Sequence, residues 1–265
     1  MKKVGPGMLI VSAIALLFLV APIFVAIPLA FSNARTLIFP PPGWSLMWFE
    51  AFFKRPDFVK GLRISLVSAT ASTILVTLIA GITAYGVVHM HGTKKRLVSL
   101  LLNVPLLIPV LVIGIAMLFF LARLRLSGTL PGLILGQVML CLPLVFLIIL
   151  AALENYNPNL EDAAASLGAP PLLVFREAVL PQVTTGLAAG AALAFITSMA
   201  DTTMSLFLRG PGATPLPAAM IAYMRARIDP MIGSSAVIFL CISIVFLIII
   251  NRLIGFEAVM GVREE

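Results

Sequence analysis

Charged residues are scarce in this chain. Only 11% of its 265 residues are Asp, Glu, Lys or Arg, whereas 61% are hydrophobic. Soluble globular domains carry about 25% charged residues, so the composition excludes that class and indicates an integral membrane protein. Six stretches hold no charged residue, and each exceeds the roughly 20 residues that a helix needs to cross the hydrocarbon core. They cover residues 4–34, 64–93, 97–122, 126–153, 178–200 and 230–251.

The alternation of apolar and polar residues that marks barrel strands is also missing. Inside lipid, each backbone polar group must be bonded within its own segment, which favours helices. The predicted fold class is therefore an all-α polytopic membrane protein with six transmembrane helices, forming a single transmembrane domain over residues 1–265. We expect the spans near residues 8–31, 62–88, 98–121, 131–153, 183–207 and 232–253. The first run is too long for the apolar core of a secretory signal, so we interpret it as a span.

Cysteine and histidine are rare, with two residues of each. Cys141 and Cys241 lie inside predicted spans, where we expect them to be small apolar fillers rather than a disulfide or metal ligands. His89 and His91 form an isolated His-x-His at the end of the second span, and we interpret them as surface residues. No metal site is predicted.

Motifs for nucleotide or covalent chemistry are lacking too. The sequence has no GxxxxGK[ST] phosphate loop and no HExxH, GxSxG or CxxC motif, so we assign no catalytic residue and do not expect the chain to hydrolyse ATP. The net charge of +7 comes from basic residues scattered through the loops. Lipid headgroups explain this pattern better than nucleic acid.

Loop charges alone leave the orientation in the membrane open. The positive-inside rule places basic loops in the cytoplasm. Lys2, Lys3 and the cluster at residues 94–96 favour a cytoplasmic amino terminus and second loop, but the first and third loops are basic as well. The opposing residues are Arg35, Lys54, Arg55, Lys60, Arg63, Arg123 and Arg125.

A polar insert separates the fourth and fifth spans at residues 157–181. Asn159 is a candidate cap for a first helix, and Gly168 is the expected stop because glycine adopts left-handed backbone angles at little cost. Pro170 and Pro171 predict the start of a second helix over residues 172–179, and Pro181 predicts a further break before the fifth span. Two interpretations follow: a helix–corner–helix that inserts into a partner's groove, or a well-capped connecting loop.

The spacing of this insert resembles the EAA loop of permease subunits of type I ABC importers. The run Asp162-Ala163-Ala164, Gly168 six residues after the acid, and Leu180-Pro181 carry the resemblance. The chain departs from the family in having Asp162 where Glu is usual, with Glu161 just before it, and Ala178 where Ile is common. The resemblance implies that the loop docks on the ATP-hydrolysing subunits. The coupling residues would be Glu161, Asp162, Ala163, Ala164, Gly168, Ala169, Phe175 and Pro181.

Other stretches resemble the branch of this family that carries polyamines, opines, phosphonates and iron(III). They include residues 39–49, 198–208 and 210–217, and Asp229-Pro230. The resemblance implies an ABC ATPase dimer that binds ATP and Mg²⁺, with no cofactor in this chain. It also implies a second permease subunit, with a paralogue favoured over a copy, and a periplasmic or surface solute-binding protein. The chain would lie in the bacterial inner membrane with both termini in the cytoplasm.

Asp201 is an isolated acid in the predicted fifth span, beside Thr202, Thr203 and Ser205. A carboxylate inside a membrane costs roughly 2.5–3.5 kcal/mol on insertion scales, so it should face a cavity or a partner charge. We therefore predict a translocation-pathway residue, with an ion pair to a partner subunit as the alternative.

The charge of the solute is left open by the residues near Asp201. The resemblance favours a polyamine only weakly, because related chains often have a second acid where this chain has Ala200. The arginines on the predicted external side keep an anionic or zwitterionic solute open, or contact the solute-binding protein; they are Arg209, Arg225 and Arg227. The helix breakers at residues 210–217 predict a re-entrant external gate.

Two other classes of protein remain as alternatives. An ion-coupled secondary transporter would be expected to carry acids in several spans, whereas Asp201 stands nearly alone. A membrane scaffold would need no pathway carboxylate.

Overall fold

The computed structural model describes residues 6–254, and the regular structure in that range is helical. Among these described residues, five helices are long and apolar enough to span a membrane, and a bent pair is the sixth candidate. The prediction of an all-α polytopic membrane protein is confirmed. Three spans lie close to their expected ranges, as α1 (Pro6–Ala30), α6 (Leu130–Glu154) and α12 (Met231–Ile254). The second, α3 (Pro56–Val88), starts earlier than residue 62, because Pro56 and Asp57 suit a first helical turn.

The third predicted span, near residues 98–121, is not one straight helix. The chain instead forms α4 (Gly92–Asn103), the short 3₁₀ turn η1 (Val104–Leu107) and α5 (Val110–Arg123). The two arms meet at an angle of 101°. Pro105 and Pro109 lack amide hydrogens, and Ile108, which precedes a proline, is extended with φ −100° and ψ 131°. Two prolines close together therefore break a stretch whose apolar composition predicts one helix.

The fifth predicted span, residues 183–207, is displaced at both ends. The helix starts at Pro171 and runs through α8 (Pro171–Val174), the π segment η2 (Phe175–Val179) and α9 (Leu180–Ala200). Pro181 lies in the first turn of α9 and does not interrupt it, contrary to the prediction. At the other end Asp201 is extended, with ψ 120°, and a separate helix follows as α10 (Thr203–Leu208).

The chain forms two compact units, Met1–Val59 with Ala219–Ile242, and Lys60–Ala218 with Ser243–Glu265. The prediction of a single domain over residues 1–265 stays a prediction. In the first unit, α2 (Met47–Phe53) follows α1, and the Trp48 indole donates to the Ala34 carbonyl at 3.1 Å. A Cβ added to Gly233 would lie 3.1 Å from the Ala30 nitrogen, so the end of α1 and the start of α12 approach closely.

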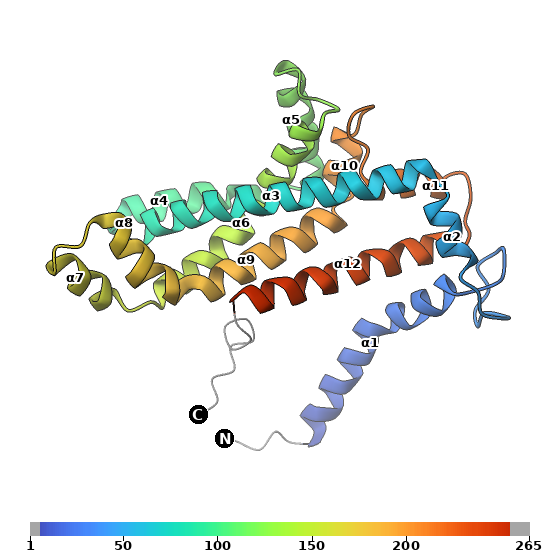
Figure 1. Cartoon of the computed structure of the whole chain (residues 1–265), viewed down its shortest axis with the longest axis horizontal. Helices are drawn as coiled ribbons and strands as arrows, with labels where there is room; N and C mark the ends of the chain where they lie inside the picture. Colours follow the sequence, from blue (N-terminus) through green and yellow to red (C-terminus); the bar gives the residue numbers. More distant parts are fainter. Residues whose placement is uncertain (1–5, 255–265) are drawn as a thin grey trace. The chain divides into compact units, whose positions relative to one another are not determined.

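The core of the second unit lies between α3, α6 and α9, and Figure 1 shows α6 beside α9. Small residues of α9 let the two backbones approach: a Cβ added to Gly186 would lie 2.3 Å from the Ala152 Cβ. Close contact of this kind is how helices associate in lipid, where no hydrophobic gain drives them together. Buried members of this core include Val76, Ala80, Val145, Phe146, Ile149, Val183 and Ala194. At one end of the unit, α7 (Pro158–Ser166) and α8 form a corner (Figure 1).

Candidate functional site

The corner begins with a capped helix. Asn157, not Asn159, caps α7: its side-chain oxygen accepts from the Asn159 amide at 3.1 Å. Pro158 takes the first helical position, where its missing amide hydrogen costs nothing. The prediction that Asn159 caps the helix is therefore wrong by two residues, because the proline moves the helix start toward the amino end.

Gly168 ends α7 as predicted. Its φ is +83°, and no heavy atom outside its immediate neighbours lies within 4 Å of where a Cβ would be. The Gly168 amide donates to the Ala165 carbonyl at 3.0 Å, and the Ala169 amide donates to the Ala164 carbonyl at 3.3 Å. These two bonds form a Schellman motif. The angle of the corner is thus set by backbone bonds that require a left-handed residue.

The corner exposes an acid, an alanine and two large apolar side chains. Leu167 is 88% exposed and Leu172 is 79% exposed, and Asp162, Ala163 and Gly168 are exposed as well. We call these five residues the corner face. Exposed leucines that flank a backbone turn form a surface suited to binding another protein. The remaining predicted coupling residues are less open, apart from the exposed Pro181: Ala164, Ala169 and Phe175 are half-buried.

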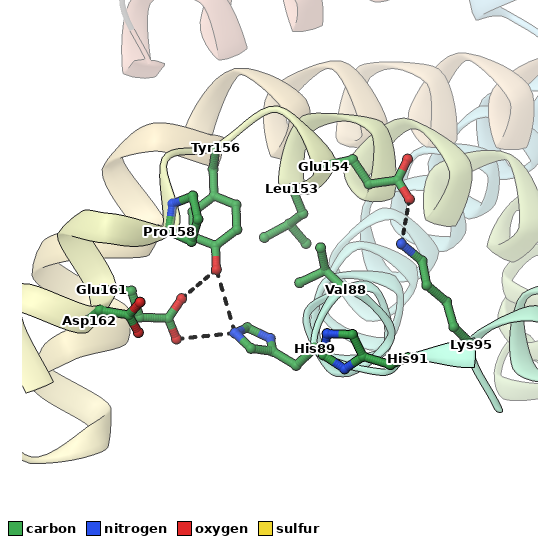
Figure 2. Close-up of a pocket in the computed structure, with 10 residues that line it drawn as sticks. All are labelled: Val88, His89, His91, Lys95, Leu153, Glu154, Tyr156, Pro158, Glu161 and Asp162. Atoms are coloured by element: carbon green, nitrogen blue, oxygen red, sulfur yellow. Dashed lines mark hydrogen bonds and ion pairs between the residues drawn. The ribbon is translucent and has the colours of Figure 1, made fainter. Parts of the chain in front are cut away.

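Glu161 points away from the corner face and into the chain. Its side chain is 16% exposed. Its carboxylate accepts from the Tyr85 hydroxyl of α3 and from the Tyr156 hydroxyl just after α6, each at 2.6 Å. The His89 Nε2 lies 3.3 Å from the same carboxylate. Figure 2 shows Tyr156 and His89 converging on Glu161. The two adjacent acids that the sequence groups together differ in exposure: Asp162 is exposed, whereas Glu161 is mostly buried.

These contacts govern the protonation of the Glu161 carboxylate. Burial raises the pKa of Glu161, but the hydrogen bonds from Tyr156 and Tyr85 and the nearby His89 outweigh it, so the pKa lies below the ordinary value. Burial and the bond to Glu161 raise the pKa of the Tyr156 phenol. At neutral pH an ionised carboxylate bonded by a protonated phenol is the stable pair.

A cleft of about 550 Å³ lies beside this group. Lys95 of α4 lines it and pairs with Glu154 at the end of α6, with 2.8 Å between Nζ and Oε1 (Figure 2). His91 and both adjacent acids, Glu161 and Asp162, also line the cleft. Within residues 6–254 no group of three or more His, Cys, Asp or Glu side chains is placed to hold a metal ion.

Asp201 lies at the break between α9 and α10. Its carboxylate accepts from the Met204 amide at 3.1 Å and from the Ser205 amide at 3.0 Å, so it caps α10. Asp201 and Ser205 are buried, whereas Thr202 and Thr203 are half-buried. In the described part of the chain, no basic side chain pairs with Asp201 within 4.0 Å. The roles of pathway residue and of ion-pair partner to another subunit stay predictions.

A buried polar cluster that the sequence analysis missed joins α3, α6 and α9. The Ser72 hydroxyl lies 3.0 Å from that of Ser198 and 3.3 Å from the Gln137 side-chain oxygen. The Gln137 amide group donates to the Ser198 carbonyl at 3.3 Å. Cys141, predicted as a filler, is buried with its sulfur 3.6 Å from the Ser198 hydroxyl. The sequence feature that could have revealed this cluster is Gln137, a long amide side chain inside an otherwise apolar span.

The predicted gate sequence forms a tight turn. Gly210 and Ala213 exchange backbone hydrogen bonds of 3.1 and 3.0 Å. A Cβ added to Gly210 would lie 2.4 Å from the Gly128 Cα, so the turn packs directly on the loop before α6. Arg209, Arg225 and Arg227 are exposed. Their predicted contacts with a solute or a binding protein stay predictions.

Comparison with known proteins places this geometry in a family. Residues 74–256 match the family of binding-protein-dependent transport system inner membrane components. The chain is 27% identical over 244 residues to the spermidine/putrescine permease protein PotC of Escherichia coli strain K12, covering 92% of each chain. It is 26% identical to the sulfate permease protein CysT of Salmonella typhimurium, covering 95% of this chain and 94% of that protein.

Solved structures share the fold. A bacterial ABC transporter involved in the import of alginate aligns with a TM-score of 0.71 at 16% identity, covering 93% of each chain. The MetNI methionine transporter aligns with a TM-score of 0.63 at 20% identity, covering 74% of this chain and 94% of that one. Because the family match spans more than two thirds of the sequence, the chain belongs to the binding-protein-dependent transport system inner membrane components and is a multi-pass permease subunit of an ABC importer.

Proposed function

We propose that the corner face is the surface on which the ATPase subunits of this importer dock. The observation that carries the proposal is the exposed acid and leucines held at a fixed angle by the Gly168 turn. An exposed apolar patch rimmed by charge is typical of a protein interface. The ATPase subunits bind ATP and Mg²⁺ and hydrolyse the nucleotide, and this chain supplies no catalytic residue and no cofactor site.

The full transporter contains two permease subunits, an ATPase dimer and a solute-binding protein. A paralogue is favoured over a copy as the second permease. The corner face is cytoplasmic, and with six spans both termini are cytoplasmic too. Closure of the ATPase dimer then displaces the corner, and rigid-body motion of the spans turns the solute path from one side of the membrane to the other.

The solute is a small hydrophilic molecule, and a polyamine is favoured. Support comes from relatives named as polyamine permeases, including PotC and the putrescine permease PotI of Escherichia coli. The competing candidates are a phosphonate, an opine, another anionic or zwitterionic solute, and iron(III). The relative named as a sulfate permease covers as much of the chain, which keeps an anionic solute in this list. Asp201 is the candidate pathway carboxylate for a cationic solute.

The test is affinity capture of the tagged chain from mild-detergent membranes, followed by mass spectrometry. Three forms are compared: the natural chain, Gly168→Val and Gly168→Asn. Valine is strained at φ +83°, whereas asparagine tolerates this region. The natural chain should retain the ATPase in stoichiometric amounts, Gly168→Val should lose most of it, and Gly168→Asn should retain clearly more than Gly168→Val. A natural chain that folds but comes out alone would reverse the proposal and favour ion-driven transport or a scaffold.

A further inference from the structure

Tyr85, on the last turn of α3, contacts both arms of the corner. Its hydroxyl donates to Glu161 of α7 at 2.6 Å. Its ring packs edge to face on Phe175 of η2, with 5.1 Å between centroids. One residue of α3 therefore holds the helix before the Gly168 turn and the helix after it.

Tyr156 provides a second attachment from another direction. It lies just after α6, and its hydroxyl donates to the other oxygen of Glu161 at 2.6 Å. The carboxylate is thus held by phenols from the ends of α3 and α6. Two oxygens bonded by donors on separate elements fix both the position and the orientation of the group.

We propose that Tyr85 and Tyr156 are positioning residues that fasten the corner to α3 and α6 through Glu161, so that a displaced corner moves these helices with it. The proposal rests on the proposed docking of the ATPase at the corner face. The proposal gives the two neighbouring acids different roles: Asp162 faces the partner, and Glu161 holds the corner to its own chain. Glu161 then has a different role from the docking role implied by the family resemblance.

The attachment leads directly into the helix core. Further along α3, Ser72 belongs to the polar cluster with Gln137 of α6 and Ser198 of α9. Displacing the end of α3 therefore acts on all three helices rather than on a free end. Without the two hydroxyls, α7 would keep its capped structure and exposed face, and the His89 Nε2, 3.3 Å from the Glu161 carboxylate, would be left as the polar contact between Glu161 and the end of α3.

The size of the effect follows from the bonds involved. Each is a hydrogen bond to a charged group, and losing one changes an equilibrium about tenfold or more. Tyr85→Phe keeps the ring contact with Phe175 and removes only the hydroxyl. We expect the double variant Tyr85→Phe/Tyr156→Phe to raise the population of detached α7 by roughly two orders of magnitude.

The experiment measures the distance between α3 and α7 by spin labelling. Cys141 and Cys241 are replaced by alanine, and single cysteines for the labels replace the exposed residues Ile82 of α3 and Ser166 of α7. The complex is captured with its ATPase and measured with and without ATP and Mg²⁺. In the natural background the distance should stay narrow and unchanged by nucleotide. In the double phenylalanine variant it should broaden and shift when ATP binds, because the corner moves without α3.

A matched control comes from the third tyrosine of the chain. Tyr223 also donates its hydroxyl to a carboxylate, that of Asp229, in the other compact unit. Tyr223→Phe should leave the label distance unchanged in both nucleotide states. A distance that stays equally narrow in the double variant and in the natural background would overturn the attachment.

The docking proposal and the attachment fail in different ways. Loss of the ATPase from the unsubstituted chain would contradict docking. Retained ATPase with an unchanged label distance in the double variant would contradict the attachment alone. The double variant itself should retain the ATPase, because the corner face keeps all five of its residues.

Discussion

The hydroxyl oxygens of Ser72 on α3 and Ser198 on α9 lie 3.0 Å apart, although 126 residues separate them in the sequence. Gln137 of α6 completes the cluster, and all three side chains are at most 2% exposed. Hydrogen bonds between membrane helices contribute about 0.6 kcal/mol on average and up to about 1.7 kcal/mol. The cluster therefore specifies which faces of three apolar helices meet, at a modest gain in stability.

Removing the hydroxyl should lower the stability of the protein at Ser72 but not at its neighbour Thr73. Ser72→Ala removes a bonded hydroxyl and leaves Gln137 short of a partner, so we expect a loss of about 1 kcal/mol. The Thr73 hydroxyl is buried, and no hydrogen-bond partner for it lies among the described residues. Thr73→Val should therefore be neutral or stabilising. Thermal unfolding of the purified chain in detergent measures both, and equal destabilisation would contradict the assigned contacts.

The spans and their breaks differ in how well the sequence predicts them. Long uncharged runs predict α1, α6 and α12 closely, because apolar length is what crossing a bilayer requires. The same criterion misses the bend at Pro105 and Pro109, since a broken helix has the same composition as a straight one. It also extends the fifth span past Asp201, because the carboxylate caps α10 and so ends the preceding helix by forming bonds that composition does not reveal.

The close packing of Gly210 on Gly128 predicts that a side chain added at position 210 lowers the stability of the protein. In Gly210→Ala the new Cβ would lie 2.4 Å from the Gly128 Cα and 2.8 Å from its carbonyl oxygen. Both atoms are backbone and cannot rotate away, so we expect a loss of about 1–3 kcal/mol. Gly86→Ala is the matched control, because no heavy atom lies within 4 Å of its added Cβ and alanine favours the helix. A melting temperature that falls equally in both variants would contradict the packing.

In the candidate site, the sequence predicts the turn of the corner but not the direction in which Glu161 points. The motif spacing predicts the turn at Gly168, because left-handed backbone angles select glycine. It groups Glu161 with Asp162, and only the fold separates them: Tyr85 lies 76 residues before Glu161 in the chain. No local pattern connects residues so far apart, so the inward-facing acid could not be predicted.

Two substitutions of Asp201 separate its possible roles. Asparagine keeps one oxygen that can accept a cap hydrogen bond but carries no charge, whereas alanine loses both properties. If the carboxylate serves only to cap α10, Asp201→Asn should keep uptake near normal, and Asp201→Ala should lower stability by about 1 kcal/mol. If the charge lines the path of a cationic solute, Asp201→Asn should abolish uptake while the ATPase stays bound. Uptake of putrescine and sulfate into vesicles containing the captured complex, with the melting temperature, distinguishes the two roles.

Acid should release α7 from α3 by protonating Glu161. Its pKa is lowered from 4.5 in the folded chain, so its stabilising effect is fully present above pH 4.5 and is lost as pH falls through the lowered value. The groups that face it are Tyr85, His89 and Tyr156. The label distance between positions 82 and 166 should be narrow from pH 5 to 8 and broaden only below about pH 4.5.

Two variants assign this transition to the carboxylate. Glu161→Gln has no carboxylate to protonate, so its label distance should not change between pH 5 and 3.5, whatever its width. His89→Gln should still broaden in the same acid range, because the carboxylate remains. A transition that persists in Glu161→Gln would contradict its assignment to this carboxylate. Glu161 would then hold the corner without being the group that acid titrates.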